Sequence, residues 1–149
     1  MDLIIQRLTK PVLKGNLNQF INILYDVPGE YWDANHFMMN LPGKFKVSCC
    51  AFIGDNLVCY IISSFRNSYT AHIHKFMTAG SLRGKKIGQT LYHYFEDLAR
   101  ANSINEVTLK VPEENTGAIK FYKKIGFEVY SQTIDSVNTK VLLQLVKTI

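Results

Sequence analysis

The sequence predicts a layered domain that mixes strands and helices, of the α/β or α+β class. Two periodicities alternate along the 149 residues: residues 69–78 (YTAHIHKFMT) alternate as in a strand, whereas Ile87, Leu91 and Phe95 recur at helical spacing. Apolar residues make up 47% and charged residues 19% of the chain, as in an ordinary globular protein. At this length we expect a single domain over residues 1–149.

The first half of the chain predicts four strands and two helices. Leu17 and Phe20 begin an apolar helix face, and Pro28 is expected to end that helix. Gly54 lies in a short polar turn between two apolar runs, which indicates a hairpin. In chain order, the expected elements are a strand at 3–8, helices at 16–25 and 30–40, and strands at 46–53, 57–65 and 69–78.

The second half predicts two helices among three strands. Pro112 is expected to stop the first of these strands, and Gly126 to close the second helix in the left-handed conformation. In chain order, the expected elements are a helix at 86–101, a strand at 105–111, a helix at 116–125 and strands at 128–133 and 139–146.

Charge and cysteine content narrow the class of ligand and the compartment. The formal net charge of +5 suits an anionic ligand, and the dispersed lysines argue against a nucleic-acid partner. Cys49, Cys50 and Cys59 lie in apolar runs without a C-x-x-C pair, which favours reduced thiols in a cytoplasmic protein without a metal site. No apolar run approaches the length of a membrane span and the N-terminus lacks a signal-peptide pattern, so we expect no membrane contact.

The segment from Arg83 to Gly88 (RGKKIG) is the most informative in the chain. It lies between the 69–78 strand and the following helix, and contains two glycines and three cations. A helix N-terminus presents unpaired N–H groups and the positive end of the helix dipole, and glycine lets the backbone approach a phosphate. We therefore interpret the segment as a cradle for a pyrophosphate.

Two other phosphate-binding motifs do not match this segment. A P-loop requires G-x-x-x-x-G-K-[ST], but Gly84 and Gly88 are four positions apart and Gln89 follows. A dinucleotide-binding fingerprint requires G-x-G-x-x-G, and this glycine triplet does not occur. What remains is an Arg-x-x-x-x-Gly turn, which is a weak signal by itself.

A second segment, residues 115–127 (NTGAIKFYKKIGF), strengthens the interpretation. Together the two segments resemble the GNAT superfamily of acyl-CoA-dependent N-acetyltransferases, which carries [Q/R]-x-x-G-x-[G/A] and then N-x-x-A-x-x-x-Y-x-x-x-G-F. The resemblance covers roughly residues 69–129. One departure is that Lys86 stands where the family has its first motif glycine. The matching positions are Arg83, Gly88, Asn115, Ala118, Tyr122, Gly126 and Phe127.

The resemblance implies a mixed, mostly antiparallel sheet that splays apart near its middle, flanked by about four helices. The cofactor would lie in the V between strands 69–78 and 105–111. The implied function is transfer of an acetyl group from acetyl-CoA to a primary amine by direct attack in a ternary complex. A non-catalytic acyl-CoA-binding module is the alternative. The implied partners are acetyl-CoA and an amine acceptor; a homodimer stays open, as does the acceptor's identity as a small molecule, a protein N-terminus or a lysine.

The resemblance also implies catalytic roles. The N–H of Phe76 would face the acetyl carbonyl near a strand bulge, and Tyr122 would protonate the departing thiolate. By a period of two, His72 and His74 share a strand face with Phe76, and His74 is the first choice for the general base. Ordinary core packing is the competing interpretation for each of these side chains. The reserve candidates for the base are Asp33, Glu113 and Glu114.

The remaining expected sites follow from the same resemblance. Asn115 would bond the pantetheine arm of CoA as well as cap the helix behind it. The acceptor would lie between the first helices and the last strand pair, where packing on the sheet is the competing role for its walls. The expected cofactor-binding residues are Phe76, Met77, Thr78, Arg83, Gly84, Lys85, Lys86, Ile87, Gly88, Gln89, Asn115 and Tyr122. The expected acceptor walls are Tyr31, Trp32, Phe37 and Tyr130, with Met38 and Met39.

Overall fold

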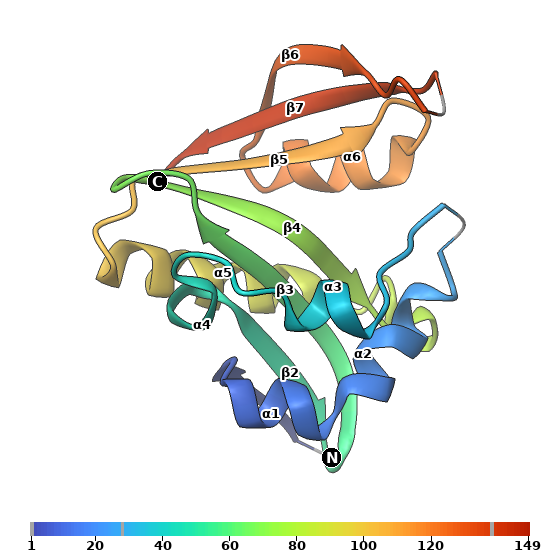
Figure 1. The fold of residues 1–149 in the computed structure, drawn as a ribbon, viewed down its shortest axis with the longest axis vertical. Helices are drawn as coiled ribbons and strands as arrows, with labels where there is room; N and C mark the ends of the chain where they lie inside the picture. Colours follow the sequence, from blue (N-terminus) through green and yellow to red (C-terminus); the bar gives the residue numbers. More distant parts are fainter. Residues whose placement is uncertain (1, 28, 138) are drawn as a thin grey trace.

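A seven-stranded sheet with helices on both faces forms the frame of the protein (Figure 1). The structure is a computed structural model that describes residues 2–27, 29–137 and 139–149. The strand order is β1-β2-β3-β4-β5-β7-β6, and every neighbouring pair is antiparallel except β4–β5. The mixed, mostly antiparallel sheet predicted from the sequence is thus confirmed.

Along the described part of the chain, four helices follow β1, three strands follow α4, and α5 and α6 then lie among the last three strands. The strands are β1 (Leu3–Arg7), β2 (Cys49–Ile53), β3 (Asn56–Phe65), β4 (Thr70–Thr78), β5 (Glu106–Pro112), β6 (Glu128–Ile134) and β7 (Val141–Thr148). The helices are α1 (Lys10–Gly15), α2 (Leu17–Leu24), α3 (Ala34–Met38), α4 (Lys44–Val47), α5 (Ile87–Ala101) and α6 (Thr116–Lys124), with a 3-10 turn at Gly80–Leu82.

Two apolar clusters lie on opposite faces of the sheet. Helices α1–α3 cover one face, where Phe20 and Phe37 pack on Tyr60. Helix α5 covers the other face with Leu91 and Phe95, both fully buried. Strands β2 and β3 are therefore buried on both sides, which explains why residues 49–53 and 57–62 form apolar runs without a polar face.

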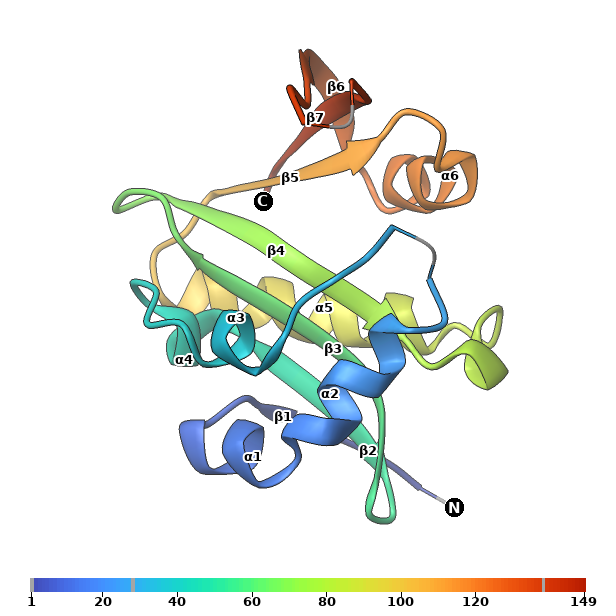
Figure 2. The ribbon, with the colours of Figure 1, turned by 45° about the vertical axis from the view of Figure 1, so that its right-hand side comes forward.

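The sheet opens between β4 and β5. In these parallel strands only residues 70–73 of β4 pair with residues 106–109 of β5. Beyond that point the two strands diverge, and the sheet separates into two halves (Figure 2). Helix α5 makes the crossover that parallel strands require. On its other side β4 pairs with β3 through a bulge, since Ile62 faces Lys75 while Ser63 faces Ile73. The V predicted between these two strands is confirmed.

An ion-pair cluster joins the two halves of the sheet. The Lys147 ammonium of β7 donates to the Glu96 carboxylate of α5, and Arg100 binds the other carboxylate oxygen at 3.0 Å. Glu96 is only 5% exposed. Burial is the largest single influence on Glu96 and would raise its pKa, but the interactions with Lys147, Tyr92 and Arg100 together outweigh burial, and the net pKa is lowered. The carboxylate is therefore held ionised where the halves meet.

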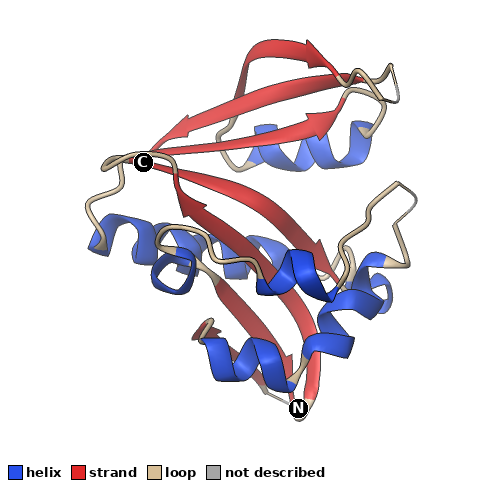
Figure 3. Cartoon of the chain, in the orientation of Figure 1, coloured by secondary structure: helices blue, strands red, loops and turns tan. Residues whose placement is uncertain are grey.

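Several predicted elements differ from those observed (Figure 3). The strand expected at 46–53 is wrong at its first residues, because Lys46 and Val47 belong to α4. That short helix is held by Lys44, whose buried ammonium donates to the carbonyl groups of Phe37 and Met39. Helix α1 was not predicted, and six α-helices occur in the described residues where about four were expected. The helix stop expected at Pro28 lies outside the described residues.

Candidate functional site

A cavity of about 690 Å³ occupies the opening between β4 and β5. Its lining includes residues 73–78 of β4 and residues 109–112 of β5, together with the starts of α5 and α6. The splay of the sheet therefore produces a long cleft between the two halves rather than a surface depression. A cleft of this kind, with mixed polar and apolar lining, is the usual form of a small-molecule site.

The N-terminus of α5 supplies free hydrogen-bond donors to this cavity. No side chain caps the helix, and no acidic residue lies in its first turn. The first helical bond runs from the Thr90 N–H to the Lys86 carbonyl. The N–H groups of Ile87, Gly88 and Gln89 therefore lie ahead of the helical ladder, and all three residues line the cavity. This end of the cleft is built to hold an anion.

Gly88 lets the helix start lie against β4. A methyl group at this position would stand 3.3 Å from the Thr78 hydroxyl and 3.7 Å from the Phe76 ring. Any larger side chain would push the helix start away from the strand. The glycine thus sets the distance between the free amides of α5 and the open edge of β4.

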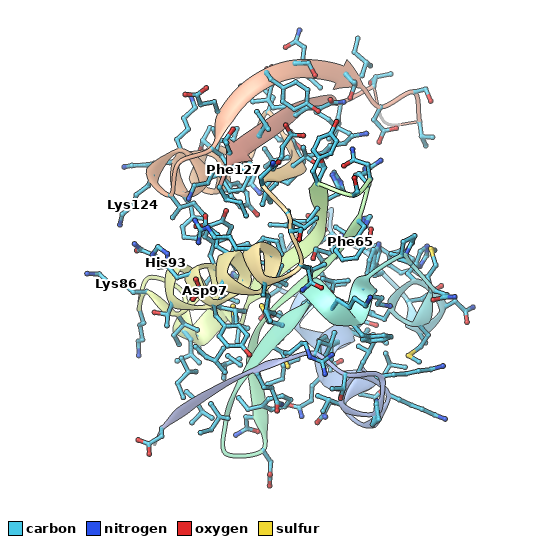
Figure 4. All side chains as sticks on the ribbon, turned by 90° about the vertical axis from the view of Figure 1, so that its left-hand side faces the viewer. Phe65, Lys86, His93, Asp97, Lys124 and Phe127 are labelled. Carbon is cyan, nitrogen blue, oxygen red and sulfur yellow. The ribbon has the colours of Figure 1, made fainter. Side chains whose placement is uncertain are left out.

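Lys86 adopts the left-handed conformation, with φ +65° and ψ +11°, at the position where the family motif has a glycine. Its side chain is exposed and leads outward from the start of α5, while Lys124 leads outward from the other half of the fold on the same side (Figure 4). The left-handed conformation explains why glycine suits this position.

Replacing Lys86 with glycine should stabilise the protein. A non-glycine residue in the left-handed region costs roughly 1–2 kcal/mol, partly offset by the greater freedom of glycine in the unfolded chain. We expect Lys86→Gly to raise the free energy of unfolding by about 1 kcal/mol, measured by urea denaturation. Lys85→Gly is the matched control, because it removes the same charge at a residue without positive φ and should not stabilise. Equal effects of the two changes would contradict the strain argument.

Phe76 lies on the cavity side of β4, after the bulge. Its ring stacks on Tyr92 of α5 at 6.3 Å between centroids and contacts Tyr122 at 6.2 Å. The bulge inserts His74 as an extra residue, so the prediction that His72, His74 and Phe76 share one face is wrong. His74 instead lies near Trp32, with 6.4 Å between ring centroids, on the side of α2 and α3. The predicted bulge itself is confirmed.

Tyr122 projects from α6 into the same cavity. Its ring packs between Phe76 and Phe127, with centroids 6.2 and 5.6 Å away. Burial raises the pKa of Tyr122 above its ordinary value, and the nearby Glu30 carboxylate raises it further. The phenol therefore keeps its proton throughout the physiological range.

The two strand histidines are neutral and hydrogen-bonded. Burial lowers the pKa of His72 to about 3 and that of His74 to about 4, with a further contribution from the Arg66 charge. His72 Nδ1 lies 2.8 Å from the Thr108 hydroxyl, and His74 Nε2 lies 2.7 Å from the Ser64 hydroxyl. Of the two, His74 lines the cavity and His72 does not.

Most of the expected cofactor-binding residues come together at the cavity. Every one of them lines it except Lys85, which is exposed nearby. The Asn115 side chain accepts a hydrogen bond from the Ala118 N–H at 3.2 Å, which confirms its role as the N-cap of α6. None of the reserve candidates for the base, Asp33, Glu113 and Glu114, lines the cavity.

The expected acceptor walls are dispersed. Phe37 is fully buried between Phe20 and Tyr60, so it belongs to the core and offers no surface to a ligand. Tyr31 and Tyr130 are 65% and 55% exposed, and Trp32 packs edge-on against Phe37. None of these four residues lines the cavity. The packing interpretation therefore holds for Phe37 and Trp32.

An ion pair that the sequence did not reveal lines the cavity where β4 meets the loop between α2 and α3. Lys75 of β4 donates to the carboxylate of Glu30, which belongs to the loop between α2 and α3. Their side chains are 13% and 23% exposed, and both residues line the cavity together with Asp26. Forty-five positions separate the partners, and no motif marks either residue.

None of the three cysteine thiols lines the cavity. Cys49, Cys50 and Cys59 are fully buried, and burial raises the pKa of Cys50 to about 11 and that of Cys59 to about 12. The described residues contain no cluster of three or more potential metal ligands. Among the described helices, none has the length and apolar character needed to cross a membrane.

The sequence of residues 17–127 matches the profile of the Acetyltransferase (GNAT) family. The chain belongs to the GNAT acetyltransferase family. Over 70 residues it is 37% identical to an uncharacterized N-acetyltransferase of Methanocaldococcus jannaschii, a match that covers 47% of this chain and 31% of that relative. The resemblance stated from the two motif segments is thereby confirmed.

Solved structures share the GNAT fold over the full chain. Ard1 from Thermoplasma volcanium is similar with a TM-score of 0.88 and 20% identity, covering 100% of this chain and 99% of that chain. Arabidopsis thaliana Naa50, in complex with the bisubstrate analogue CoA-Ac-MVNAL, is similar with a TM-score of 0.78 and 18% identity, covering 100% of both chains. At such identities the likeness concerns the GNAT fold alone.

Proposed function

We propose that this GNAT protein, as one domain over residues 1–149, transfers an acetyl group from acetyl-CoA to a primary amine. The observation that carries the proposal is the convergence of two features at one cavity: the uncapped N-terminus of α5 and the phenol of Tyr122. The first suits a diphosphate, and the second suits a leaving group that needs a proton. The bisubstrate analogue bound by Arabidopsis thaliana Naa50 contains CoA, which supports the same ligand class here.

The chain offers donors for the diphosphate and for the acetyl carbonyl of acetyl-CoA. The amides of Ile87, Gly88 and Gln89 would hold the diphosphate, and Arg83 at the cavity edge would add a bidentate cation. The edge of β4 that β5 leaves unpaired after Ile73 would direct the Phe76 N–H at the acetyl carbonyl. A backbone donor of this kind stabilises the developing oxyanion without any reorganisation.

The proton lost by the amine needs an acceptor on the Lys75 side of the cavity. Glu30 is our first choice, because its carboxylate already binds an ammonium group, that of Lys75. His74 is the second choice: with a pKa of about 4 it is a weak base, although it is neutral at pH 7 and so able to accept a hydrogen bond. Tyr122 would then deliver its proton to the departing thiolate.

Direct transfer fits this cavity better than an acyl-cysteine intermediate. No cysteine is among the described residues that line the cavity. Burial also keeps all three thiols protonated, and the thiolate is the nucleophilic form. The amine is therefore expected to attack the thioester while both substrates are bound.

Thermal stabilisation by acetyl-CoA tests the ligand, and thiol release tests the reaction. A ligand at about 100 times its Kd stabilises the folded state by about 2.7 kcal/mol, so acetyl-CoA at millimolar concentration should raise Tm by several degrees. Thiol release should then follow the addition of a panel of primary amines, with mass detection of the acetylated product. Adenosine, which lacks the diphosphate, is the control ligand and should shift Tm far less.

The two measurements separate the competing functions. Stabilisation without thiol release across the amine panel would favour a non-catalytic acyl-CoA-binding module. The absence of any shift with acetyl-CoA would rule out both functions. Release of thiol with amines but without an acetylated product would indicate simple thioester hydrolysis.

A further inference from the structure

Lys75 places a primary amine inside the proposed reaction cavity. Its side chain is 13% exposed and lines the cavity. It immediately precedes Phe76, whose N–H is the proposed donor to the acetyl carbonyl. The bulge that makes His74 an extra residue sets Lys75 and Phe76 at the open edge of β4, where β5 has already diverged.

The Lys75 amine contacts residues of the loop between α2 and α3. Its Nζ is 5.6 Å from the ring centroid of Trp32 and bonds the Glu30 carboxylate. That same carboxylate raises the pKa of Tyr122, so the charge of Glu30 is felt at the phenol. An amine, a carboxylate able to take its proton and a phenol able to protonate the leaving group thus line the same cavity.

We propose that Lys75 is a self-acetylation site, modified by the protein's own bound acetyl-CoA when no external amine occupies the cavity. This inference rests on the proposed function. Glu30 takes one proton from the Lys75 ammonium, and the freed amine attacks the acetyl carbon to form the amide C–N bond. The C–S bond breaks, and the second nitrogen proton replaces the one that Tyr122 gives to the thiolate. The products are N-acetyl-Lys75, CoA thiol and one proton, which Glu30 releases to solvent.

Acetylation at this position removes a charge from the acceptor end of the cavity. The neutral amide cannot form the ion pair, so Glu30 loses its cationic partner from β4. The acetyl group also remains in the space that an external amine would enter. Self-acetylation therefore competes with external amines and ends once Lys75 is modified.

The other cavity lysines provide internal controls. Lys86 and Lys124 lie at the start of α5 and the end of α6, where they point outward (Figure 4). Lys110 is exposed on β5. Among the described residues, none of these three lysines forms an ion pair with a carboxylate. Lys75 should therefore be acetylated faster than these three lysines, which lack a carboxylate to take the proton.

The test follows the mass of the full-length protein after acetyl-CoA is added without any amine. The starting protein is first shown by its mass to carry no acetyl group. We expect one added acetyl group, located at Lys75 by peptide mapping, and formed at least about tenfold faster than at Lys110 because the amine is held at the thioester. The fraction modified at a given time should not depend on protein concentration, as expected for a reaction within one chain.

Lys75→Arg is the matched variant, since arginine retains the cation beside Glu30 and is not an acyl acceptor. It should lose the added acetyl group but keep the Tm shift with acetyl-CoA. Equal labelling of Lys75 in urea-unfolded protein, or equal rates at Lys75 and Lys110, would overturn the proposal. Thiol release to external amines, together with a Lys75 that stays unmodified when acetyl-CoA is added without any amine, would overturn self-acetylation alone. Failure of acetyl-CoA to shift Tm would remove the proposed function, and this inference with it.

Discussion

Tyr122→Phe should lower kcat about 100-fold while leaving the Tm shift with acetyl-CoA unchanged. The variant removes the proton that the leaving thiolate would receive, and general acid catalysis contributes typically 10²–10⁴-fold. The lower end of that range applies because a thiolate is a good leaving group, with an ordinary thiol pKa near 8.5. The phenylalanine ring retains the contacts with Phe76 and Phe127, so the fold and the cavity should be preserved.

Steady-state thiol release, measured with the amine found in the panel, checks this prediction. Tyr69→Phe is a suitable control, because Tyr69 is 51% exposed and does not line the cavity. It should retain the parental kcat. An unchanged kcat in Tyr122→Phe would remove Tyr122 from the acid role, and loss of the Tm shift would instead indicate a binding defect.

The free energy of unfolding should fall steeply as the pH drops from about 6.5 to about 4. In the folded protein the pKa is about 3 for His72 and about 4 for His74, chiefly because of burial. In the unfolded chain both groups should titrate near 6.5. Below that pH the unfolded state takes up protons that the folded state does not, so stability is lost as the pH decreases. Near pH 5 each histidine contributes a slope of about 1.4 kcal/mol per pH unit to the free energy of unfolding. Together the two histidines contribute about 2.7 kcal/mol per pH unit.

Urea denaturation at several pH values between 4.5 and 7.5 would measure this slope. His72→Gln and His74→Gln should each remove about half of it, whatever their effect on absolute stability. His93→Gln changes an exposed histidine of α5 and should leave the slope as it is. A slope that survives in both strand variants would show that the two histidines are not the groups that resist protonation.

The elements that could be predicted are those whose signals are local. Helix α5, its apolar face and the phosphate cradle before it were read from a short run of residues, as was the N-cap of α6 at Asn115. Gly126, with φ +107°, closes α6 as expected. In each case the hydrogen bonds and backbone angles involve residues within one turn of each other, so spacing along the chain contains the information.

The misplaced elements depend on distant contacts. Residues 46–53 read as one strand, but the buried ammonium of Lys44 ties the start of that run to the carbonyl groups at the end of α3. The bulge at His74 arises from the register between β3 and β4, and it reverses the face expected for Phe76. A strict alternation cannot reveal an inserted residue, because its position depends on the partner strand.

The sequence alone predicted the proposed cofactor side of the cavity: a helix start after Lys86, Gly88 within its first turn and a tyrosine one helix further on. Only the tertiary structure decided the acceptor side, where the loop after α2 brings Glu30 against Lys75 of β4 and where Phe37 turns inward to the core. The physical reason lies in the range of the interactions. Amides at a helix start are set by the residues beside them, whereas an ion pair across 45 positions exists only when the fold brings β4 and the loop after α2 together.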